Sequence, residues 1–406
     1  MTFDCTIASI PALPQLDVDS PEFTNDPLAA FDALRPGWAA QSARGVEVFS
    51  YRAVEAIYRS ANFTAGVTKL IAEMGLDSVS LSGSGANLQS NDGPDHDRLR
   101  KVVSRWFTPS AVARLEPRVA ELTGRLLDPL TEAGGGDLMA GVARHVPGPV
   151  FCWMIGAPDE LGERVFALSE TLLLAFEGDA ANADAISGAA LELSLLIDEI
   201  VIEKRSRPDD DLLTVLIDAA DRDEISPDDV HSLMFELLGA STDNTAHSVG
   251  LAAAVLGGDS ERWALLRDAP ALVPNALEEC ARVEPRIRCD SAWAPDGADL
   301  LGLEIPPGTM VWQHTAGAHH DPKVFPDPYR VDLTREQPVK QLNFGVGRHF
   351  CLGAALARME LRTIFATMLD QWSEFAVEAD AAIDRTGGSA SVGSLRFTCT
   401  SRVSLP

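Results

Sequence analysis

The chain has 406 residues, of which 46% are hydrophobic and 23% charged, values typical of a globular protein. This composition excludes a disordered, collagen-like or coiled-coil protein. Lys and Arg total 33 against 60 Asp and Glu, so the net charge is −27 and most of the surface repels nucleic acid and anionic membranes. We therefore expect no nucleic acid partner and no membrane attachment.

The chain contains 6 cysteines, too few for a disulfide scaffold of this length and without the paired spacing of a zinc site. No apolar run approaches the roughly 18 to 20 residues that a membrane span requires. Asp4 lies where a secretion signal would carry a basic residue. We expect a cytoplasmic monomer with reduced thiols, folded as a single domain over 1–406.

The first two thirds of the chain are predominantly helical in pattern. Residues 1–45 form a Pro-rich N-terminal arm, and 45–51 alternate apolar and polar positions as a β-strand does. From 51 to about 283, apolar residues recur at intervals of three and four. Within this region 66–92 are rich in Gly and Ser, which is compatible with either a surface loop or a lid over a site.

The last third of the chain has a different sequence pattern. Prolines punctuate short extended segments over 285–350, a helix is predicted over 352–372, and 385–406 are again rich in strands and loops. Within that last part, 396–400 and 402–404 look like a terminal hairpin. The pattern as a whole predicts a mainly α fold with a small β-rich subdomain.

One helix is predicted to be exceptionally long. Ser226 is a favourable N-cap, Pro227 suits the first helical position, and Asp229 completes the capping pattern. An uninterrupted helical pattern then continues to about Gly257, which corresponds to about 45 Å at 1.5 Å per residue.

The most informative segment is FGVGRHFCLG at 344–353. Gly345 and Gly347 permit a tight backbone turn, and Cys351 lies at the entry to the predicted helix. The positive end of a helix dipole stabilises a thiolate, which can serve as a nucleophile or a metal ligand. From these residues alone Cys351 could be a nucleophile, an iron ligand or a buried core residue.

The spacing of Phe344, Gly347, His349, Cys351 and Gly353 resembles, residue for residue, the haem-binding loop of the cytochrome P450 family. The resemblance implies a cytochrome P450 fold with a long central helix over the haem, and haem b as cofactor. It also implies that Cys351 is the axial ligand of the haem iron. By the same matching Phe344 packs beside the ligand loop, His349 bonds a haem propionate, and Gly353 lets the following helix approach the porphyrin.

Two distant patterns also match the family. Glu279 and Arg282 resemble its buried ion pair, to which Arg335 in a later loop would belong. His96 and Arg100 lie four residues apart on one helical face and resemble the pair that binds a haem propionate. The alternative for the second pair is a solvated basic helix face.

The family motif Ala-Gly-x-Asp/Glu-Thr-Thr corresponds here to Ala-Ser-Thr-Asp-Asn-Thr at 240–245. The resemblance assigns Asp243 to proton delivery, but Asn244 occupies the position of the usual threonine. An Asn amide can hold a water molecule, but it cannot relay a proton as a rotating hydroxyl does. We therefore expect the route to use ordered water, Asp243 and either Thr242 or Thr245.

A second departure concerns an arginine that the family places about ten residues after the one matching Arg282. That position falls near 291–293, where no arginine occurs. Arg286 and Arg288 come earlier, on the same face of a predicted strand. Arg288 is nearer the expected position and is our candidate propionate donor, while the other could pair internally or bind an acidic substrate.

The resemblance implies a bacterial-type monooxygenase that inserts one oxygen atom of O2 into a small-to-medium hydrophobic substrate, by hydroxylation or O-dealkylation. The expected substrate pocket includes Leu237, Leu238, Ser241 and Ile287. Electrons would come from a separate ferredoxin and its reductase. A basic docking face is predicted from Lys101, Arg105, Arg348, Arg358 and Arg362, although surface arginines are also commonly paired with acids.

Three other functions are compatible with parts of the sequence. A peroxide-dependent relative would typically lack the helix acid, so Asp243 argues against it. A haem-binding protein without turnover would keep the same loop. A cysteine hydrolase using Cys351 and His349 would leave the distant motifs unexplained.

Overall fold

The computed structural model describes residues 13–76, 87–89, 91–177, 179–336, 340–379 and 381–402. The chain divides into two compact units, each assembled from separate parts of the sequence. The first unit comprises Met1–Lys69, Glu278–Cys351 and Asp384–Ser391, and the second comprises Leu70–Leu277, Leu352–Ile383 and Val392–Pro406.

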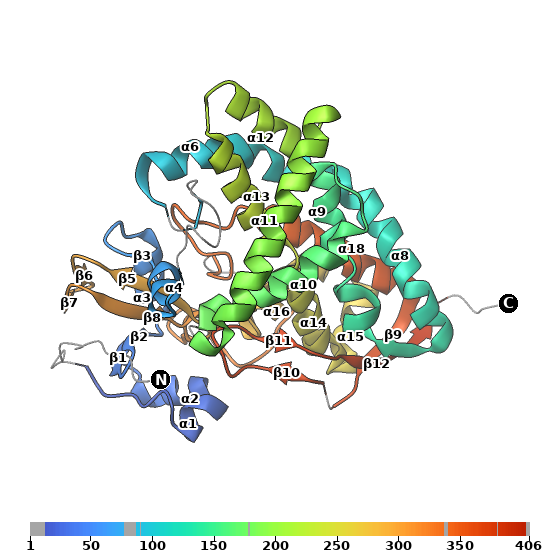
Figure 1. The fold of residues 1–406 in the computed structure, drawn as a ribbon. Helices are drawn as coiled ribbons and strands as arrows, with labels where there is room; N and C mark the ends of the chain where they lie inside the picture. The colour runs from blue at the N-terminus through green and yellow to red at the C-terminus, as the bar shows by residue number, and fades with distance from the viewer. Residues whose placement is uncertain are drawn as a thin grey trace. The chain divides into compact units, whose positions relative to one another are not determined.

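Helices dominate the described residues, which confirms the predicted mainly α fold (Figure 1). The α-helices are α1 (Pro21–Asn25), α2 (Pro27–Leu34), α3 (Tyr51–Arg59), α4 (Val67–Glu73), α6 (Gly93–Val103), α7 (Pro109–Val112), α8 (Glu116–Ala133), α9 (Pro147–Ile155), α10 (Leu161–Leu173), α11 (Ala183–Ser206), α12 (Leu212–Asp221), α13 (Pro227–Ser241), α14 (Asp243–Gly257), α15 (Ser260–Asp268), α16 (Val273–Val283), α17 (Thr315–His319) and α18 (Ala354–Gln371).

Short helices and strands complete the described structure. The 3₁₀ turns are η1 (Ser104–Phe107), η2 (Ala113–Leu115), η4 (Leu174–Glu177), η5 (Ala180–Asn182) and η6 (Pro270–Leu272), and η3 (Met139–Ala143) is a π-helical turn. The strands are β1 (Ala39–Ser42), β2 (Gly45–Val48), β3 (Thr64–Ala65), β4 (Gly135–Asp137), β5 (Asp290–Ala294), β6 (Ala298–Leu300), β7 (Leu303–Ile305), β8 (Thr309–Gln313), β9 (Trp372–Val377), β10 (Ile383–Asp384), β11 (Ser391–Val392) and β12 (Arg396–Ser401).

The first unit is built on a five-stranded sheet of order β1-β2-β8-β5-β3. The predicted strand at 45–51 is confirmed as β2, which runs parallel to β8 and pairs Val46 with Val311. The predicted N-terminal arm is more ordered than its Pro-rich pattern indicates. It contains α1 and α2, which Ser20 and Asp26 cap through their side chains.

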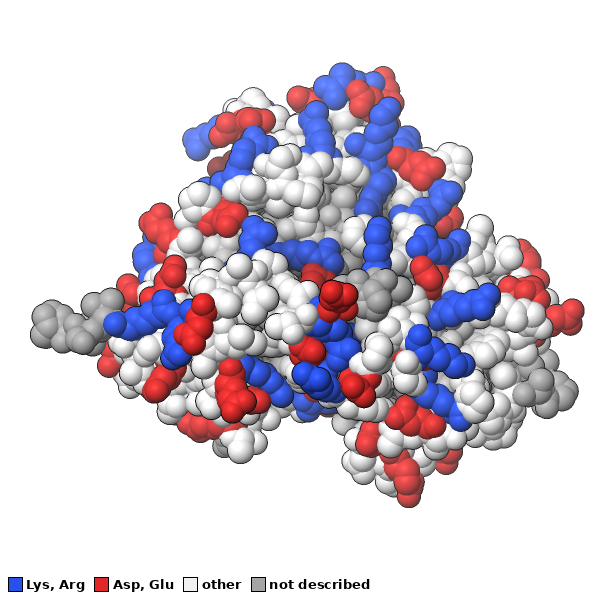
Figure 2. Space-filling view, turned by 180° about the vertical axis from the view of Figure 1, so that it is seen from behind, with Lys and Arg blue, Asp and Glu red and all other residues white. Residues whose placement is uncertain are grey.

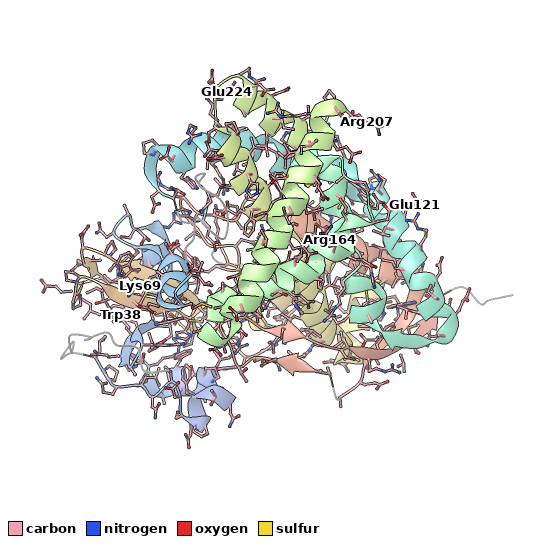
Figure 3. The ribbon with its side chains drawn as sticks, in the orientation of Figure 1. Trp38, Lys69, Glu121, Arg164, Arg207 and Glu224 are labelled. Carbon is pink, nitrogen blue, oxygen red and sulfur yellow. The ribbon has the colours of Figure 1, made fainter. Side chains whose placement is uncertain are left out.

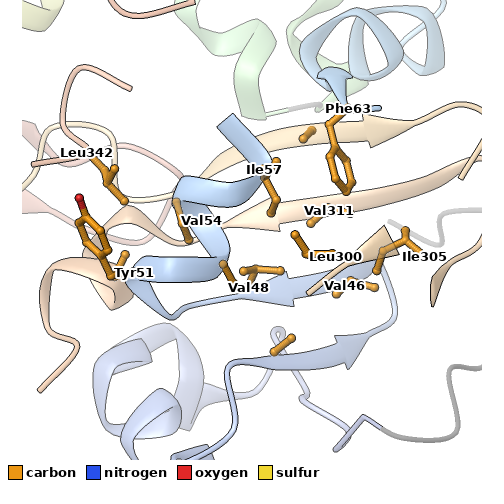
Figure 4. Packing of buried hydrophobic residues seen from close by; sticks show 14 of the residues in the cluster. Val46, Val48, Tyr51, Val54, Ile57, Phe63, Leu300, Ile305, Val311 and Leu342 are labelled. Carbon is orange, nitrogen blue, oxygen red and sulfur yellow. The ribbon is translucent and has the colours of Figure 1, made fainter. Parts of the chain in front are cut away.

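Apolar side chains from the sheet and from α3 form the core of the first unit (Figure 4). Val54 and Ile57 project from α3 at an i,i+3 spacing and are almost fully buried with Val46 and Val311 of the sheet. Burial of each such side chain contributes about 1.5 to 3 kcal/mol relative to exposure. This packing holds α3 in place, and the carbonyl group of Tyr58 on α3 reaches the cysteine loop described below.

The second unit is a helical assembly with a three-stranded sheet of order β4-β12-β9. Within it α18 packs on α8, and α10 contacts α9, α11, α13 and α14. Of the terminal hairpin predicted from 396–400 and 402–404, the first strand is present within β12, which lies between β9 and β4, and residues 403 and 404 lie outside the described residues. The predicted helix at 352–372 is confirmed as α18.

The predicted uninterrupted helix is also wrong in one respect, because it breaks at Thr242 into α13 and α14. The capping pattern at its start is present, since Ser226 accepts a hydrogen bond from the Asp229 backbone and the Asp229 carboxylate accepts one from Ser226. At the break Thr242 has φ −104° and ψ −63°, outside the usual helical values. The Ser241 hydroxyl donates to the Leu238 carbonyl, competing locally with the helical hydrogen bonds.

Within the described residues, no helix is both long enough and apolar enough to span a bilayer.

Candidate active site

The loop that ends at Cys351 belongs to the first unit. Gly345 and Gly347 adopt φ values of 63° and 81°, in the left-handed region that the sequence anticipated for them. A Cβ atom on Gly347 would lie 2.6 Å from the Tyr58 carbonyl oxygen, so only glycine fits there without displacing α3. The Cys351 amide donates to the Phe344 carbonyl at 2.8 Å and closes the loop.

Cys351 differs from the other cysteines that the structure describes. It is exposed, whereas Cys152 and Cys280 are buried and Cys289 and Cys399 are partly buried. Burial raises the pKa of the Cys152 thiol to about 12 and that of Cys399 to about 11, which disfavours their thiolates. Cys351 is therefore the one exposed residue among the described cysteines. His349, two residues earlier, is also exposed.

The structure brings Glu279, Arg282 and Arg335 together in the first unit. Arg282 donates to both carboxylate oxygens of Glu279 at 2.8 Å, and Arg335 donates to one of them at 3.1 Å. Burial opposes ionisation of Glu279, but hydrogen bonds from Arg282, the Asp332 backbone and Arg335 outweigh it and lower the pKa of Glu279. Arg282 also donates to the carbonyls of His319 and Pro328, so the pair ties α16 to two later segments.

The two candidate propionate arginines have separate partners. The predicted strand at 285–290 is absent, because β5 begins at Asp290, and so the shared strand face does not exist. Arg286 donates to the Ala390 carbonyl at 2.8 Å. Arg288 is 8% exposed and lies 3.7 Å from Glu284, which already offsets its charge.

His96 and Arg100 lie on α6 in the second unit, four residues apart as predicted. His96 is 2% exposed, and its Nδ1 atom is 3.2 Å from the Asp97 carboxylate. Arg98 on the same helix pairs with Asp229 at the start of α13. The pair with Asp229 fixes α6 against a second helix.

The motif at 240–245 surrounds the break between α13 and α14. Asp243 and Thr242 are buried, Thr245 is 7% exposed, and Asn244 is partly exposed. The Thr242 hydroxyl and the Asn244 side-chain oxygen are buried atoms without a hydrogen-bond partner in the described part of the chain. Because buried polar atoms are normally paired, these two are suited to hold water or a polar ligand.

Sequence reasoning missed His247, which lies one turn beyond Asp243 on α14. Its Nε2 atom is 3.1 Å from the Asp243 carboxylate, and its Nδ1 atom accepts the Val392 amide hydrogen at 3.0 Å. The i,i+4 spacing of an acid and a histidine is a signal that could have found the first contact. The contact with Val392 is visible only in the folded chain.

The pocket candidates belong to different units. On α13, Leu237 is 8% exposed and Leu238 is 1% exposed, and the Leu238 carbonyl accepts from Ser169 of α10 as well as from Ser241. Ile287 lies in the first unit, where its backbone forms an isolated bridge with Ser389. Within the Gly- and Ser-rich segment at 66–92, Val67–Glu73 form α4, whereas residues 77–86 and 90 lie outside the described residues.

Most of the predicted basic residues lie on neighbouring elements of the second unit. Lys101 on α6 and Arg105 on η1 are exposed, and η1 packs against α18, which carries Arg358 and Arg362. Arg362 pairs with Glu116 at 3.1 Å. Figure 2 shows Lys and Arg side chains interspersed with Asp and Glu on one face of the protein. Arg348 is exposed in the cysteine loop of the first unit.

The donor set is suited to haem b. An exposed thiol at the end of a glycine-shaped loop can serve as the single axial ligand that a haem-thiolate protein needs. Among the described residues, the unpartnered oxygens of Thr242 and Asn244 are polar groups that can hold water.

Comparison with known proteins agrees with these observations. Residues 278–391, which contain the Glu279–Arg282 pair and the cysteine loop, match the family model described as cytochrome P450. The chain is similar to 6-deoxyerythronolide B hydroxylase of Saccharopolyspora erythraea, with 33% identity over 73% of this chain and 72% of that protein. It is also similar to the cytochrome P450 monooxygenase PikC of Streptomyces venezuelae, with 30% identity over 92% of this chain and 90% of that one.

Solved structures resemble the whole fold. The crystal structure of CalO2 superimposes with a TM-score of 0.86 and 25% identity, covering 96% of this chain and 99% of that one.

Proposed function

Because the chain belongs to the cytochrome P450 family, whose members bind haem b, we propose that this oxidoreductase inserts one oxygen atom of O2 into a small-to-medium hydrophobic substrate by hydroxylation or O-dealkylation. The observation that carries the proposal is the exposed Cys351 at the end of the loop shaped by Gly345 and Gly347. Its relatives include a hydroxylase and a monooxygenase, which supports oxygen insertion.

The haem iron, when bound, supplies the oxygen-activating redox chemistry, and the protein supplies binding and orientation. We assign Cys351 as the axial ligand, with Phe344 and Gly353 beside it. His349, His96 and Arg100 would bind the propionates. Arg288 is a weaker candidate for that role, since Glu284 already offsets its charge.

Proton delivery would rely on the residues around the helix break. Asp243 is the acid, and the side-chain oxygens of Asn244 and Thr242 can hold a water molecule because they have no partner among the described residues. Thr245 is the remaining hydroxyl of the motif. This arrangement replaces the usual threonine hydroxyl with an amide that holds water.

Electrons would come from a separate ferredoxin that docks on the basic residues Lys101, Arg105, Arg358 and Arg362, with Arg348 as a further candidate. The first four are supported by two contacts of η1, which carries Arg105: η1 packs on α18, the helix of Arg358 and Arg362, and it directly follows α6, the helix of Lys101. The positive charges would attract an acidic partner. Arg358→Glu should therefore slow the reduction of the haem protein by ferredoxin, with the largest effect at low ionic strength.

The substrate would contact Leu237, Leu238 and Ser241 on α13, and Ile287. A panel of terpenoids, aromatic ethers, steroids and fatty acids tests the substrate class. Binding of a substrate beside these residues should shift the absorption spectrum of the haem-loaded protein. If none of these compounds shifts the spectrum, the prediction of a hydrophobic substrate is contradicted.

The decisive experiment is the absorption spectrum of the reduced, carbon-monoxide-bound protein. Thiolate ligation should give the long-wavelength Soret band, and Cys351→Ala should abolish it. Cys399→Ala is the matched control and should retain the band. If haem-loaded protein lacks the band, or if Cys351→Ala keeps it, the proposed function is wrong.

A further inference from the structure

Three side chains with acid–base chemistry meet inside the second unit. Glu170 comes from α10, and Asp243 and His247 come from α14. One oxygen or nitrogen atom from each lies within 4.8 Å of the other two. Asp243 and His247 are buried, with side chains 3% and 6% exposed. None of the family motifs in the sequence includes Glu170 or His247.

Backbone geometry determines which nitrogen of His247 carries the proton. The Val392 amide donates to Nδ1 at 3.0 Å, so Nδ1 must be unprotonated. In a neutral ring the proton is then on Nε2, which lies 3.1 Å from Oδ1 of Asp243 and donates to it. Gly250 on α14 permits this contact, because a Cβ atom at this position would lie 3.1 Å from the Val392 side chain and would crowd it.

This tautomer argues against a metal ion at the three side chains, although their spacing would suit one. A metal on Nε2 would have to replace the proton there, and Nδ1 is already an acceptor. The ring would then carry no proton at all. Histidine ligands normally donate their second N–H to a carboxylate or carbonyl, the reverse of what Val392 requires.

Glu170 connects this buried pair with the protein surface. Its side chain is 37% exposed, and the guanidinium of Arg144 lies 3.5 Å from it. The Glu170 and Asp243 carboxylates are within 4.8 Å, a separation that one water molecule can bridge. Two neighbouring carboxylates repel each other when both are ionised, and the positive charge of Arg144 offsets part of this repulsion.

We propose that Glu170 passes protons from solvent to Asp243 and that His247 is a positioning residue for Asp243. In the transfer, protonated Glu170 gives its proton through water to an oxygen of ionised Asp243, and solvent reprotonates Glu170; no electrons move. His247 holds Oδ1 of Asp243 through its Nε2 atom, which fixes the orientation of the carboxylate that accepts and passes the proton. The inference rests on the proposed function, since the proton is consumed in oxygen activation.

The first test compares Glu170→Gln with Glu163→Gln in the haem-loaded protein. Glu163 lies on the same helix with its side chain 77% exposed, and is the matched control. Direct proton transfer typically contributes 10²- to 10⁴-fold, so we expect Glu170→Gln to reduce product formed per reduced cofactor by at least about tenfold. The solvent deuterium isotope effect should increase, and Glu163→Gln should match the parent. An unchanged Glu170→Gln would overturn the relay.

The second test observes His247 itself in 15N-histidine-labelled, reduced, carbon-monoxide-bound protein. The 15N shifts should show Nε2 protonated and Nδ1 unprotonated, with the resonances assigned by their loss in His247→Gln. The amide of His247→Gln can still donate to Asp243, so this variant should restore most of the product yield that His247→Ala loses. A protonated Nδ1, or equal yields from the two variants, would contradict the positioning role.

Two further measurements distinguish an error in the proposed relay from an error in the proposed function. Stoichiometric zinc binding that His247→Ala abolishes would replace the relay with a metal site. Absence of the long-wavelength Soret band from the parent protein would overturn the proposed function together with the relay. A normal band with an unchanged Glu170→Gln would overturn the relay alone.

Discussion

The guanidinium of Arg98 lies 2.7 Å from the Asp229 carboxylate and thereby ties α6, the helix of His96 and Arg100, to the first turn of α13. Asp229 is 4% exposed and also accepts the Ser226 amide hydrogen in the capping box. One carboxylate therefore both starts a helix and anchors a second one.

Asp229→Asn should lower the free energy of unfolding by about 1 to 3 kcal/mol, because the amide keeps one acceptor for the cap but loses the charge that Arg98 requires. Urea unfolding at neutral pH measures the change. Glu121→Gln is the control, since Glu121 pairs with Arg125 on the outside of α8 and is labelled in Figure 3. Exposed pairs contribute only about 0 to 1 kcal/mol, so a control as damaging as Asp229→Asn would refute the anchoring role.

Glu279→Gln should be more destabilising, by about 3 to 5 kcal/mol, because it leaves the buried charge of Arg282 without its carboxylate. Glu192→Gln removes the partner of exposed Arg164 and should change stability by less than about 1 kcal/mol. Thermal unfolding of both variants checks the difference. Equal melting temperatures would show that the pair contributes little.

The stability of the protein should fall as the pH is lowered from neutrality, partly through His319. Burial lowers the pKa of His319 from 6.5 to about 3, and its Nε2 atom accepts the Leu342 amide hydrogen at 2.9 Å. Between these values the unfolded chain binds a proton that the folded chain excludes, so stability is present above pH 6.5 and is lost as the pH falls. The slope should be on the order of 1 kcal/mol per pH unit for this residue.

Urea unfolding at several pH values between 7 and 4 tests the contribution of His319. His319→Gln can still accept from Leu342 but does not titrate, so its stability should depend less on pH than that of the parent. Identical pH dependence in the two proteins would assign the effect to other groups.

Gly347→Ala should disrupt the cysteine loop. It places a Cβ atom 2.6 Å from the Tyr58 carbonyl oxygen at a residue whose φ is 81°. We expect a loss of haem content and a stability decrease of about 1 to 3 kcal/mol. Gly188→Ala is the control, because a Cβ atom there meets nothing within 4 Å on α11, and it should stabilise the helix by about 0.5 to 1 kcal/mol. Full haem content in Gly347→Ala would show that the loop tolerates a side chain.

Asn244→Ala should lower the product formed per reduced cofactor, since it removes the buried oxygen proposed to hold water. Asn244→Thr restores a hydroxyl and should perform at least as well as the parent, because a hydroxyl both accepts and donates a proton. Peroxide released per reduced cofactor is the complementary measurement. If both variants match the parent, Asn244 has no part in proton delivery.

Sequence alone was sufficient to predict the tight turn of the cysteine loop, because the turn depends on glycines within the loop itself. Gly345 and Gly347 have the left-handed conformations that only glycine adopts freely, and they determine where Cys351 lies. The meeting of Glu279, Arg282 and Arg335 could also be anticipated, although only by resemblance to a family. Strand β2 and helix α18 were predictable from local periodicity.

The tertiary structure alone decided the features that depend on distant segments. The helix break at Thr242 reverses an expectation drawn from the local pattern, and β12 pairs with β4, a strand more than 250 residues earlier in the sequence. The proton position on His247 depends on Val392, which is 145 residues away in sequence. A hydrogen-bond acceptor acquires a distant donor only when the chain folds. The sequence by itself therefore determined the glycine turns of the cysteine loop, and tertiary contacts decided which groups lie next to Asp243.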